Sequence, residues 1–388
     1  AYGAVFGVFL AQKLAGKHRP LPKFAVQSPD FMLGFFKGTG KLTKKQMERN
    51  LQAAQLGLFP PPDVDLSWHV RAWGWWVLQR AKAELERFYP AVGGKPTAAY
   101  LWARTIACKD CRATVPLLKT RWLCKKDNKR VLLTMAPEAG KREVVFGIDP
   151  DVPAVGTNAA QRREYDKRIG AGTMTRSGAK CPCCGSMLTK EDIKLEGQAG
   201  RLGTVMTAIV VDGKDRKEYR LPTDEDIRLA AEAKNEIDRI FDEIPFGLPD
   251  EPIIEDAKRN TWCVQYGLDQ WHKLFTHRQL LALGTIVKHT RAARDAMREE
   301  GYPEEWIEAV SGYLALMIDR LADYSSMICI WSLGEFVCHT FTRFALPVAW
   351  DFVEGNPIGN TSGNYEGATD WVGRVLDHLL HVSHNSPD

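Results

Sequence analysis

Two pairs of cysteines constrain this chain more than any other feature of its sequence. The first pair is Cys108 and Cys111, and the second pair is Cys181 and Cys184. Two Cys-x-x-Cys pairs supply four thiolates for a tetrahedral metal site, because each pair presents two sulfurs from one tight turn. The sequence therefore predicts one structural Zn²⁺ ion held by these four residues.

The spacing between the two pairs is unusual. Residues 112–180 separate them, whereas about 15–20 residues are usual in a zinc ribbon. The site must either close a long loop or flank an inserted subdomain. Cys183 is an alternative fourth ligand; we prefer Cys184 for its spacing and because Gly185 follows it, where such turns often need a positive φ.

The cysteines also allow two other interpretations. The chain has nine cysteines, an odd number without the dense framework of a secreted disulfide scaffold, which favours a reducing compartment such as the cytoplasm. A redox-active pair and a set of unrelated buried thiols are the alternatives to a metal site. Four of the other cysteines stand singly among apolar residues and are expected to be buried: Cys124, Cys263, Cys329 and Cys338.

Length and patterning indicate more than one folded region. The 388 residues exceed a typical single domain, and the first residue is Ala, so we expect a segment of a longer protein. We expect an α+β fold in which a β-rich zinc-ribbon module over 97–222 lies between a mainly helical region over 1–96 and a helical region over 223–388. No apolar run reaches the length of a membrane span, so no membrane partner is expected.

Periodicity locates the expected elements. Helices are expected over 44–56, 64–89, 223–242, 277–300, 303–321, 335–344 and 368–381. Strands are expected over 115–123, 130–135, 143–148 and 205–211, and loops over 149–173 and 351–367. The helix over 64–89 carries tryptophans at 68, 73, 75 and 76, more than one face can bury, so it must be enclosed or meet another domain.

Basic residues concentrate in the expected zinc module. Residues 101–222 carry 24 Lys and Arg but 14 Asp and Glu, which suggests a polyanion partner. Cations beside an aromatic platform suit phosphates and a stacked base, so we expect double-stranded DNA to bind here. The alternative is a solvated hairpin with a buried Trp122. The predicted DNA contacts are Lys119, Arg121, Trp122, Lys125, Lys126, Lys129 and Arg130.

Two further motifs are weak. Gly38-Thr39-Gly40-Lys41 lacks the first glycine and the preceding strand that a phosphate-binding loop needs. His378, His381 and His384 follow one another at three-residue steps, but the last turn of a helix also favours His through the helix dipole.

Several stretches together resemble a known family of enzymes. They are Trp68-His-Val-Arg-Ala-Trp-Gly-Trp-Trp, Tyr100-Leu-Trp-Ala-Arg-Thr with the first cysteine pair, Gln198-Ala-Gly-Arg-Leu-Gly, Lys273-Leu-Phe-Thr-His-Arg-Gln-Leu-Leu-Ala-Leu, Leu316-Met-Ile-Asp-Arg-Leu-Ala-Asp-Tyr-Ser, and Trp350-Asp-Phe-Val-Glu-Gly-Asn-Pro with Ser362-Gly363. The chain resembles, from about 66 to 380, the adenine-specific DNA methylases that contain a zinc ribbon. The resemblance implies an S-adenosylmethionine-dependent adenine-N6 methyltransferase whose halves bracket the zinc-ribbon insertion.

The chain departs from that family where catalysis takes place. Neither the family's Asp-Pro-Phe-x-Gly-x-Gly cofactor loop nor its catalytic Asp-Pro-Pro-Tyr tetrapeptide is present, and Pro60-Pro61-Pro62-Asp63 has the wrong order. The expectation is therefore a central segment that binds zinc and DNA, while S-adenosylmethionine belongs to the full-length protein. The loop from Glu354 to Gly363 is expected nearest the missing catalytic half. The rival hypothesis is a non-catalytic zinc-ribbon scaffold for other defence or modification proteins.

Overall fold

The chain forms two compact units, each built from segments far apart in the sequence. The computed structural model describes residues 2–40, 42–138, 141–254, 260–342 and 345–385. Unit 1 comprises residues 1–86, 283–321 and 365–388, and unit 2 comprises residues 87–282 and 322–364. The boundaries expected at 96/97 and 222/223 stay predictions, and each unit is described below by itself.

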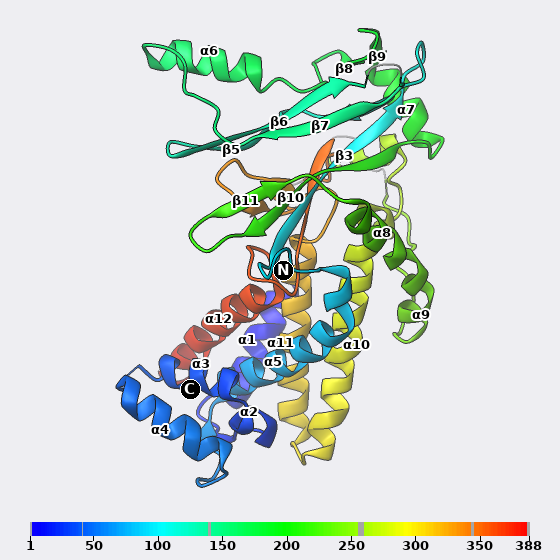
Figure 1. Cartoon of the computed structure of the whole chain (residues 1–388). Helices are drawn as coiled ribbons and strands as arrows, with labels where there is room; N and C mark the ends of the chain where they lie inside the picture. Colours follow the sequence, from blue (N-terminus) through cyan, green and yellow to red (C-terminus); the bar gives the residue numbers. More distant parts are fainter. Residues whose placement is uncertain (1, 41, 139–140, 255–259, 343–344, 386–388) are drawn as a thin grey trace. The chain divides into compact units, whose positions relative to one another are not determined.

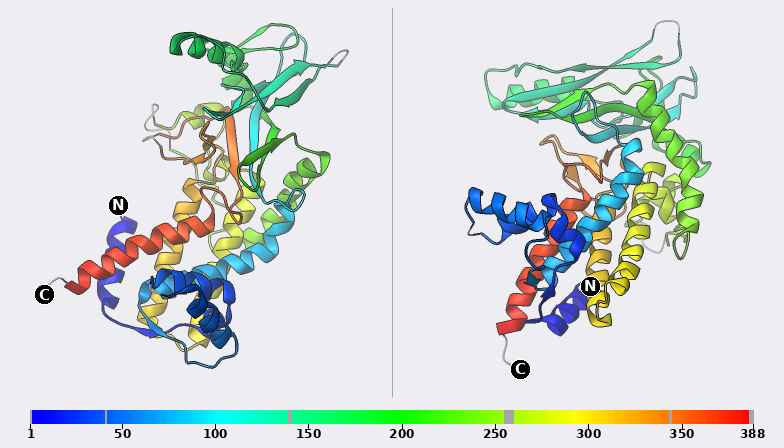
Figure 2. Two further views of the ribbon diagram at one scale, coloured as in Figure 1. Left: turned by 60° about the vertical axis from the view of Figure 1, so that its left-hand side comes forward. Right: turned by 60° about the horizontal axis from the view of Figure 1, so that its bottom comes forward.

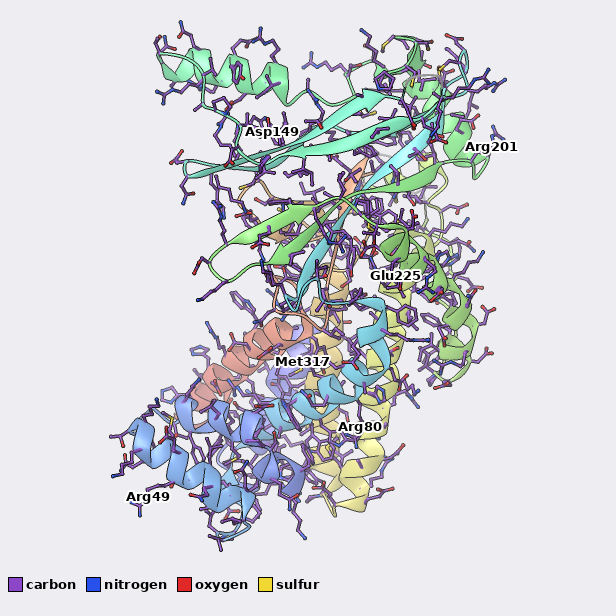
Figure 3. All side chains as sticks on the ribbon, in the orientation of Figure 1. Arg49, Arg80, Asp149, Arg201, Glu225 and Met317 are labelled. Atoms are coloured by element: carbon purple, nitrogen blue, oxygen red, sulfur yellow. The ribbon has the colours of Figure 1, made fainter. Side chains whose placement is uncertain are left out.

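Unit 1 is helical. Its helices are α1 (Tyr2–Leu14), α2 (Lys23–Gln27), α3 (Pro29–Gly38), α4 (Lys44–Gln55), α5 (Leu66–Leu85), most of α10 (His277–Glu299), nearly all of α11 (Glu304–Asp323) and α12 (Tyr365–Asn385), with a short pairing of β1 (Arg19–Pro20) and β2 (Asp63–Val64) (Figure 1). Helix α12 packs on α5 and α1 (Figure 2). Met317, labelled in Figure 3, lies on the buried face of α11. Its sulfur accepts a hydrogen bond from the Thr369 hydroxyl of α12.

Helix α5 explains the crowded tryptophans of the sequence. It begins after Asp65, whose side chain accepts a hydrogen bond from the Trp68 amide. Trp73 is fully buried, and Trp68 lies edge-on to Phe35 with the ring centroids 4.6 Å apart. The helix is therefore enclosed on several sides within unit 1, as one of the two alternatives predicted.

Unit 2 is organised around one long strand. Strand β3 (Thr97–Ala107) pairs along its length with β10 (Gly203–Asp212), and on its other edge with β14 (Asp351–Gly355) and β4 (Thr114–Leu117). Strand β11 (Lys217–Arg220) completes this antiparallel sheet beyond β10. Ten of the eleven residues of β3 are buried or half-buried, so the strand forms the centre of the unit.

Smaller elements surround this sheet in unit 2. A meander joins β5 (Trp122–Lys126), β6 (Lys129–Pro137) and β7 (Val144–Asp149), and two hairpins join β8 (Gly178–Lys180) to β9 (Met187–Thr189) and β12 (Ile330–Trp331) to β13 (Val337–Cys338) (Figure 1). The helices are α6 (Ala159–Ile169), α7 (Lys190–Gln198), α8 (Asp224–Glu232) and α9 (Ile237–Asp242). One-turn 3₁₀ segments are η1 (Glu86–Phe88), η2 (Ala233–Glu236), η3 (Trp262–Tyr266) and η4 (Trp271–Leu274).

The structure confirms the α+β class and corrects several expected elements. The helix expected over 335–344 is wrong: its described residues contain β13, and Glu335 has φ 69°, which is incompatible with a continuing helix. The loop expected over 351–367 begins as β14, and the loop over 149–173 contains α6. Along the described residues, no helix is long and apolar enough to cross a membrane.

Candidate metal centre

The two cysteine pairs occupy equivalent turns of two hairpins in unit 2. Cys108 and Cys111 lie in the turn between β3 and β4, and Cys181 and Cys184 lie in the turn between β8 and β9. The residues between the pairs fold into the β5–β7 meander and α6. An inserted subdomain therefore accounts for the long spacing, as one of the two alternatives predicted.

The backbone hydrogen bonds of the two turns match residue for residue. The amide of Cys108 donates to the Ala113 carbonyl, and the amide of Cys181 donates to the Ser186 carbonyl, both at 2.8 Å. The residue after each pair has a positive φ, 63° at Arg112 and 77° at Gly185. Two copies of one turn geometry thus present two sulfurs each.

The sulfur positions fit one metal ion. All four Sγ atoms lie within 4.8 Å of one another. The Cys108–Cys184 and Cys111–Cys181 Sγ distances are both 3.7 Å. Four sulfurs about 2.3 Å from one tetrahedral Zn²⁺ lie about 3.8 Å apart, whereas a disulfide requires about 2.0 Å. The four cysteines therefore lie close enough to hold a metal ion.

The pKa values of the thiols in the cluster shift in different directions. Burial disfavours the Cys108 thiolate, but amide N–H groups of Cys111 and Asp110 and neighbouring thiols donate to its sulfur and lower its pKa to about 7. At Cys184 the Ser186 amide favours the thiolate, yet desolvation and the neighbouring thiols raise the pKa to about 12. Four adjacent thiolates repel one another, so ionising them together requires a cation between them.

A small core and two polar contacts support the turns. Ile106, Val115, Leu188 and Ile193 are buried beneath the cysteines with several neighbours. Lys109 forms an ion pair with Asp192 at 3.0 Å, and that carboxylate also accepts the Thr189 amide at the start of α7. The Ser186 hydroxyl donates to Asp110, which links one cysteine turn to the other.

The remaining cysteines lie outside this cluster. The Cys183 Sγ, the alternative fourth ligand, lies 3.9 Å from the Glu143 carbonyl and is absent from the four-sulfur group. Cys124, Cys263 and Cys329 are buried among apolar residues, and Cys338 is half-buried. The side chain of His384 and the whole of Lys41 lie outside the described residues, which leaves the histidine and glycine-rich motifs without a structural account.

The predicted DNA-binding cations engage other groups of unit 2. Glu335 accepts Lys126 at 2.6 Å and also pairs with Lys129, whereas Asp166 pairs with Arg130 and lies 3.6 Å from Lys125. These two carboxylates offset much of the positive charge that the β5–β6 hairpin carries over residues 125–130.

The other three predicted contact residues also have partners. Arg121 donates to the carbonyls of Ile169 and Ala171 at 2.5 and 2.9 Å. Lys119 lies near the Asp351 carboxylate. Trp122 is 6% exposed, and its indole N–H donates to the Asp166 carbonyl at 3.0 Å, so it offers no open face on which a base could stack.

Helix α6 presents cations in a region where the sequence predicts a loop. Within the described part of the chain, no carboxylate forms an ion pair with Arg162, Arg163, Lys167 or Arg168. The Asn158 side chain accepts the Gln161 amide and begins the helix. That capping residue is the signal that could have revealed α6, since the helix has almost no apolar face.

The loop from Glu354 to Gly363, expected nearest the missing catalytic half, makes polar contacts within unit 2. Glu354 is fully buried and pairs with the equally buried Arg278 at 2.5 Å, and it also accepts the Trp102 indole N–H at 3.0 Å. The side-chain amide of Asn356 donates to the Thr97 carbonyl, and the Ser362 hydroxyl accepts the backbone N–H of Val337. These polar groups therefore fix the edge of the main sheet.

Comparison with known proteins adds no relative: no family model, no curated protein and no solved structure matches this chain.

Proposed function

We propose that this chain is a zinc-stabilised, DNA-contacting segment of an S-adenosylmethionine-dependent adenine-N6 DNA methyltransferase, without catalytic activity of its own. The observation that carries the proposal is the cluster of four cysteine sulfurs at the tips of two matched hairpin turns. Zn²⁺ is the metal assigned, since a closed tetrahedral set of four thiolates on short turns suits structural zinc.

The enzymatic class rests on the sequence resemblance. This chain supplies neither the cofactor loop nor the catalytic tetrapeptide, so S-adenosylmethionine is assigned only to the complete protein. We expect no label to pass from radioactive S-adenosylmethionine to adenine-containing duplex DNA when this chain alone is incubated with both. Robust transfer would contradict the assignment of a non-catalytic segment.

For the DNA contact, the cations of α6 are now the stronger candidates. Arg162, Arg163, Lys167 and Arg168 lack carboxylate partners among the described residues, whereas much of the charge on the 125–130 hairpin is offset by Asp166 and Glu335. Because Asp166 belongs to α6 and bonds to Arg130, the helix and the hairpin form one surface. Lys125 and Lys126 are partly exposed there and complete the proposed DNA contact.

A salt titration of duplex binding tests this assignment. Replacing the four α6 cations by Gln should flatten the slope of log affinity against log salt by about three to four units, if each contacts a phosphate. Replacing Lys125, Lys126, Lys129 and Arg130 should flatten it less, because two carboxylates already neutralise part of their charge. A matched control replaces Lys37, Lys44, Lys45 and Arg49, four cations on α3 and α4 of unit 1.

The competing function is a scaffold module without DNA contact. The observation that favours it is the internal pairing of the hairpin cations. Identical salt slopes for the parent, the α6 variant and the unit 1 control would show that the α6 cations do not contact DNA, and would support the scaffold function.

A further inference from the structure

Unit 2 contains a cavity of about 510 Å³ that no part of the proposed function uses. Arg104 and Thr204 line it from the paired strands β3 and β10. Lys234 and Asp238 line it from η2 and α9, and three further polar residues come from η4 and the start of α10: His272, Lys273 and His277. Its volume lies within the range of about 300–1,000 Å³ that is usual for small-molecule sites.

Arg104 is the unusual group in this cavity. It is 4% exposed, and its Nε donates to the Ala349 carbonyl at 3.0 Å. Its Nη2 atom is buried without a hydrogen-bond partner among the described residues, and the guanidinium carbon lies 5.5 Å from the centre of the Phe352 ring. Burial lowers the Arg104 pKa to about 10, so the guanidinium stays charged at neutral pH. A buried charge without a counterion is unfavourable unless an anion joins it.

Two lysines are among the other polar residues that line the cavity. Lys234 is exposed and forms no ion pair among the described residues, whereas Lys273 pairs with Asp269 at 2.6 Å. Asp238 is the only carboxylate among the lining residues of this cavity. His277 stands at the first position of α10, where backbone N–H groups and the helix dipole also favour an anion.

The other half of the lining residues are apolar. They are Leu202, Ile237, Leu248, Leu268, Phe275, Leu280 and Met327. The cavity therefore has room and apolar surface for a compact, less polar body attached to an anion.

We propose that this cavity binds a phosphate monoester of mononucleotide size. The guanidinium of Arg104 keeps its Nη2 donor without a partner, and the ammonium of Lys234 adds a point charge, a combination suited to a phosphate with three acceptor oxygens. The apolar lining residues hold the rest of the ligand. The site is independent of the zinc and DNA proposals, because it uses none of their residues.

Isothermal titration of the metal-loaded chain tests the site with three probes: inorganic phosphate, adenosine 5′-monophosphate and adenosine. Both phosphates should bind, and the nucleotide should bind more tightly if the apolar lining residues contribute. Adenosine should bind at least about tenfold more weakly than the nucleotide, because it lacks the charge that Arg104 requires. Adenosine binding as tight as that of the nucleotide would overturn the proposal.

Variants separate the cavity from non-specific charge. Arg104→Met should weaken nucleotide binding by about tenfold or more, and Lys234→Ala by about threefold to tenfold. Lys234 is exposed, so its variant keeps the test valid should Arg104→Met fail to fold. Asp238→Asn should strengthen binding, and Lys214→Ala, an exposed lysine outside the cavity, should leave it unchanged. No binding of either phosphate at millimolar concentration, or equal binding by the parent and the Lys234→Ala chain, would overturn the site.

Discussion

At the scale of single residues, the two cysteine turns share one geometry but differ in how well their sequences suit it. The position after each pair has a positive φ, and it holds Gly185 in one turn and Arg112 in the other. Glycine adopts this conformation without cost, whereas a side chain with a Cβ is strained there. The positive φ at Gly185 was predictable from the sequence. The positive φ at Arg112 was not, because arginine has no preference for that conformation.

Arg112→Gly should therefore stabilise unit 2. We expect a gain of about 0.5–1 kcal/mol in the free energy of unfolding, measured by urea denaturation. Arg112→Ala is the matched control, because it removes the charge but keeps the strain. Gly185→Ala should do the reverse and cost about 1 kcal/mol, since only its φ and no nearby backbone opposes the new Cβ. Equal effects of the glycine and alanine substitutions at position 112 would refute this account.

Asp351 should make stability depend on pH. Burial raises its pKa to about 6, although the Lys119 ammonium and nearby backbone N–H groups favour the carboxylate. The native state therefore binds this proton more tightly than the unfolded chain, whose Asp pKa is about 3.9. The associated stability is complete below about pH 4 and is lost as the pH rises through about 6.

Asp351→Asn should remove that loss. The variant should gain about 1–2 kcal/mol at pH 7 and almost nothing at pH 4. Urea denaturation of both proteins at the two pH values measures the difference. A gain of the same size at pH 4 and pH 7 would show that ionisation of Asp351 is not its cause.

At the scale of elements, the sequence predicted strongly periodic segments better than segments defined by their neighbours. Helices α4 and α5 lie within the segments predicted as helices, over 44–56 and 64–89, and begin at the side-chain caps Thr43 and Asp65. Strand β3 is buried along nearly all its length, so it lacks the alternation that identifies a half-exposed strand. Helix α6 is held by polar contacts, among them the Asp166–Arg130 ion pair and the hydrogen bond from the Trp122 indole to the Asp166 carbonyl, and it shows almost no amphipathic pattern.

The Asp166–Arg130 ion pair should hold α6 against the β5–β6 hairpin. A double-mutant cycle of Asp166→Asn and Arg130→Gln should give a coupling free energy of about 1–3 kcal/mol at pH 7. The Arg130 hydrogen bond, and to a lesser extent Lys125, lowers the Asp166 pKa against the effect of burial. The ion pair of Asp166 therefore stabilises the fold fully above the pKa that Asp has in the unfolded chain. This stabilisation is lost as the pH falls through the lower pKa of Asp166 in the folded protein. A coupling near zero at pH 7 would mean that α6 is held by other contacts.

At the scale of the whole molecule, the chain distributes its segments between two units in an order that sequence patterns do not reveal. The helices α10, α11 and α12 follow the β-rich region in sequence, yet α12 and most of α10 and α11 belong to unit 1 with the first 86 residues. Local periodicity gives the helices but not their partners, because the pairing depends on contacts between residues hundreds of positions apart. The cysteine cluster, by contrast, was predictable because its chemistry requires four sulfurs at one point.

Metal removal should loosen one unit and leave the other intact. If zinc links the hairpins of unit 2, a chelator should accelerate amide hydrogen exchange by about tenfold or more in peptides covering 106–118 and 178–190. Peptides from α3 and α4 in unit 1 should be unchanged. Equally accelerated exchange in both units would indicate global unfolding. Unchanged exchange in both units would show that the metal does not stabilise the fold.

The zinc content of the purified chain tests the central claim most directly. Elemental analysis should find one zinc per chain. The Cys108→Ser, Cys181→Ser double variant should lose the zinc and melt at a lower temperature, since structural zinc contributes directly to folding. Cys183→Ser is the matched control and should keep both properties, because Cys183 lies outside the four-sulfur group. Well under one zinc per parent chain, or unchanged zinc content and melting temperature in the double variant, would contradict the account.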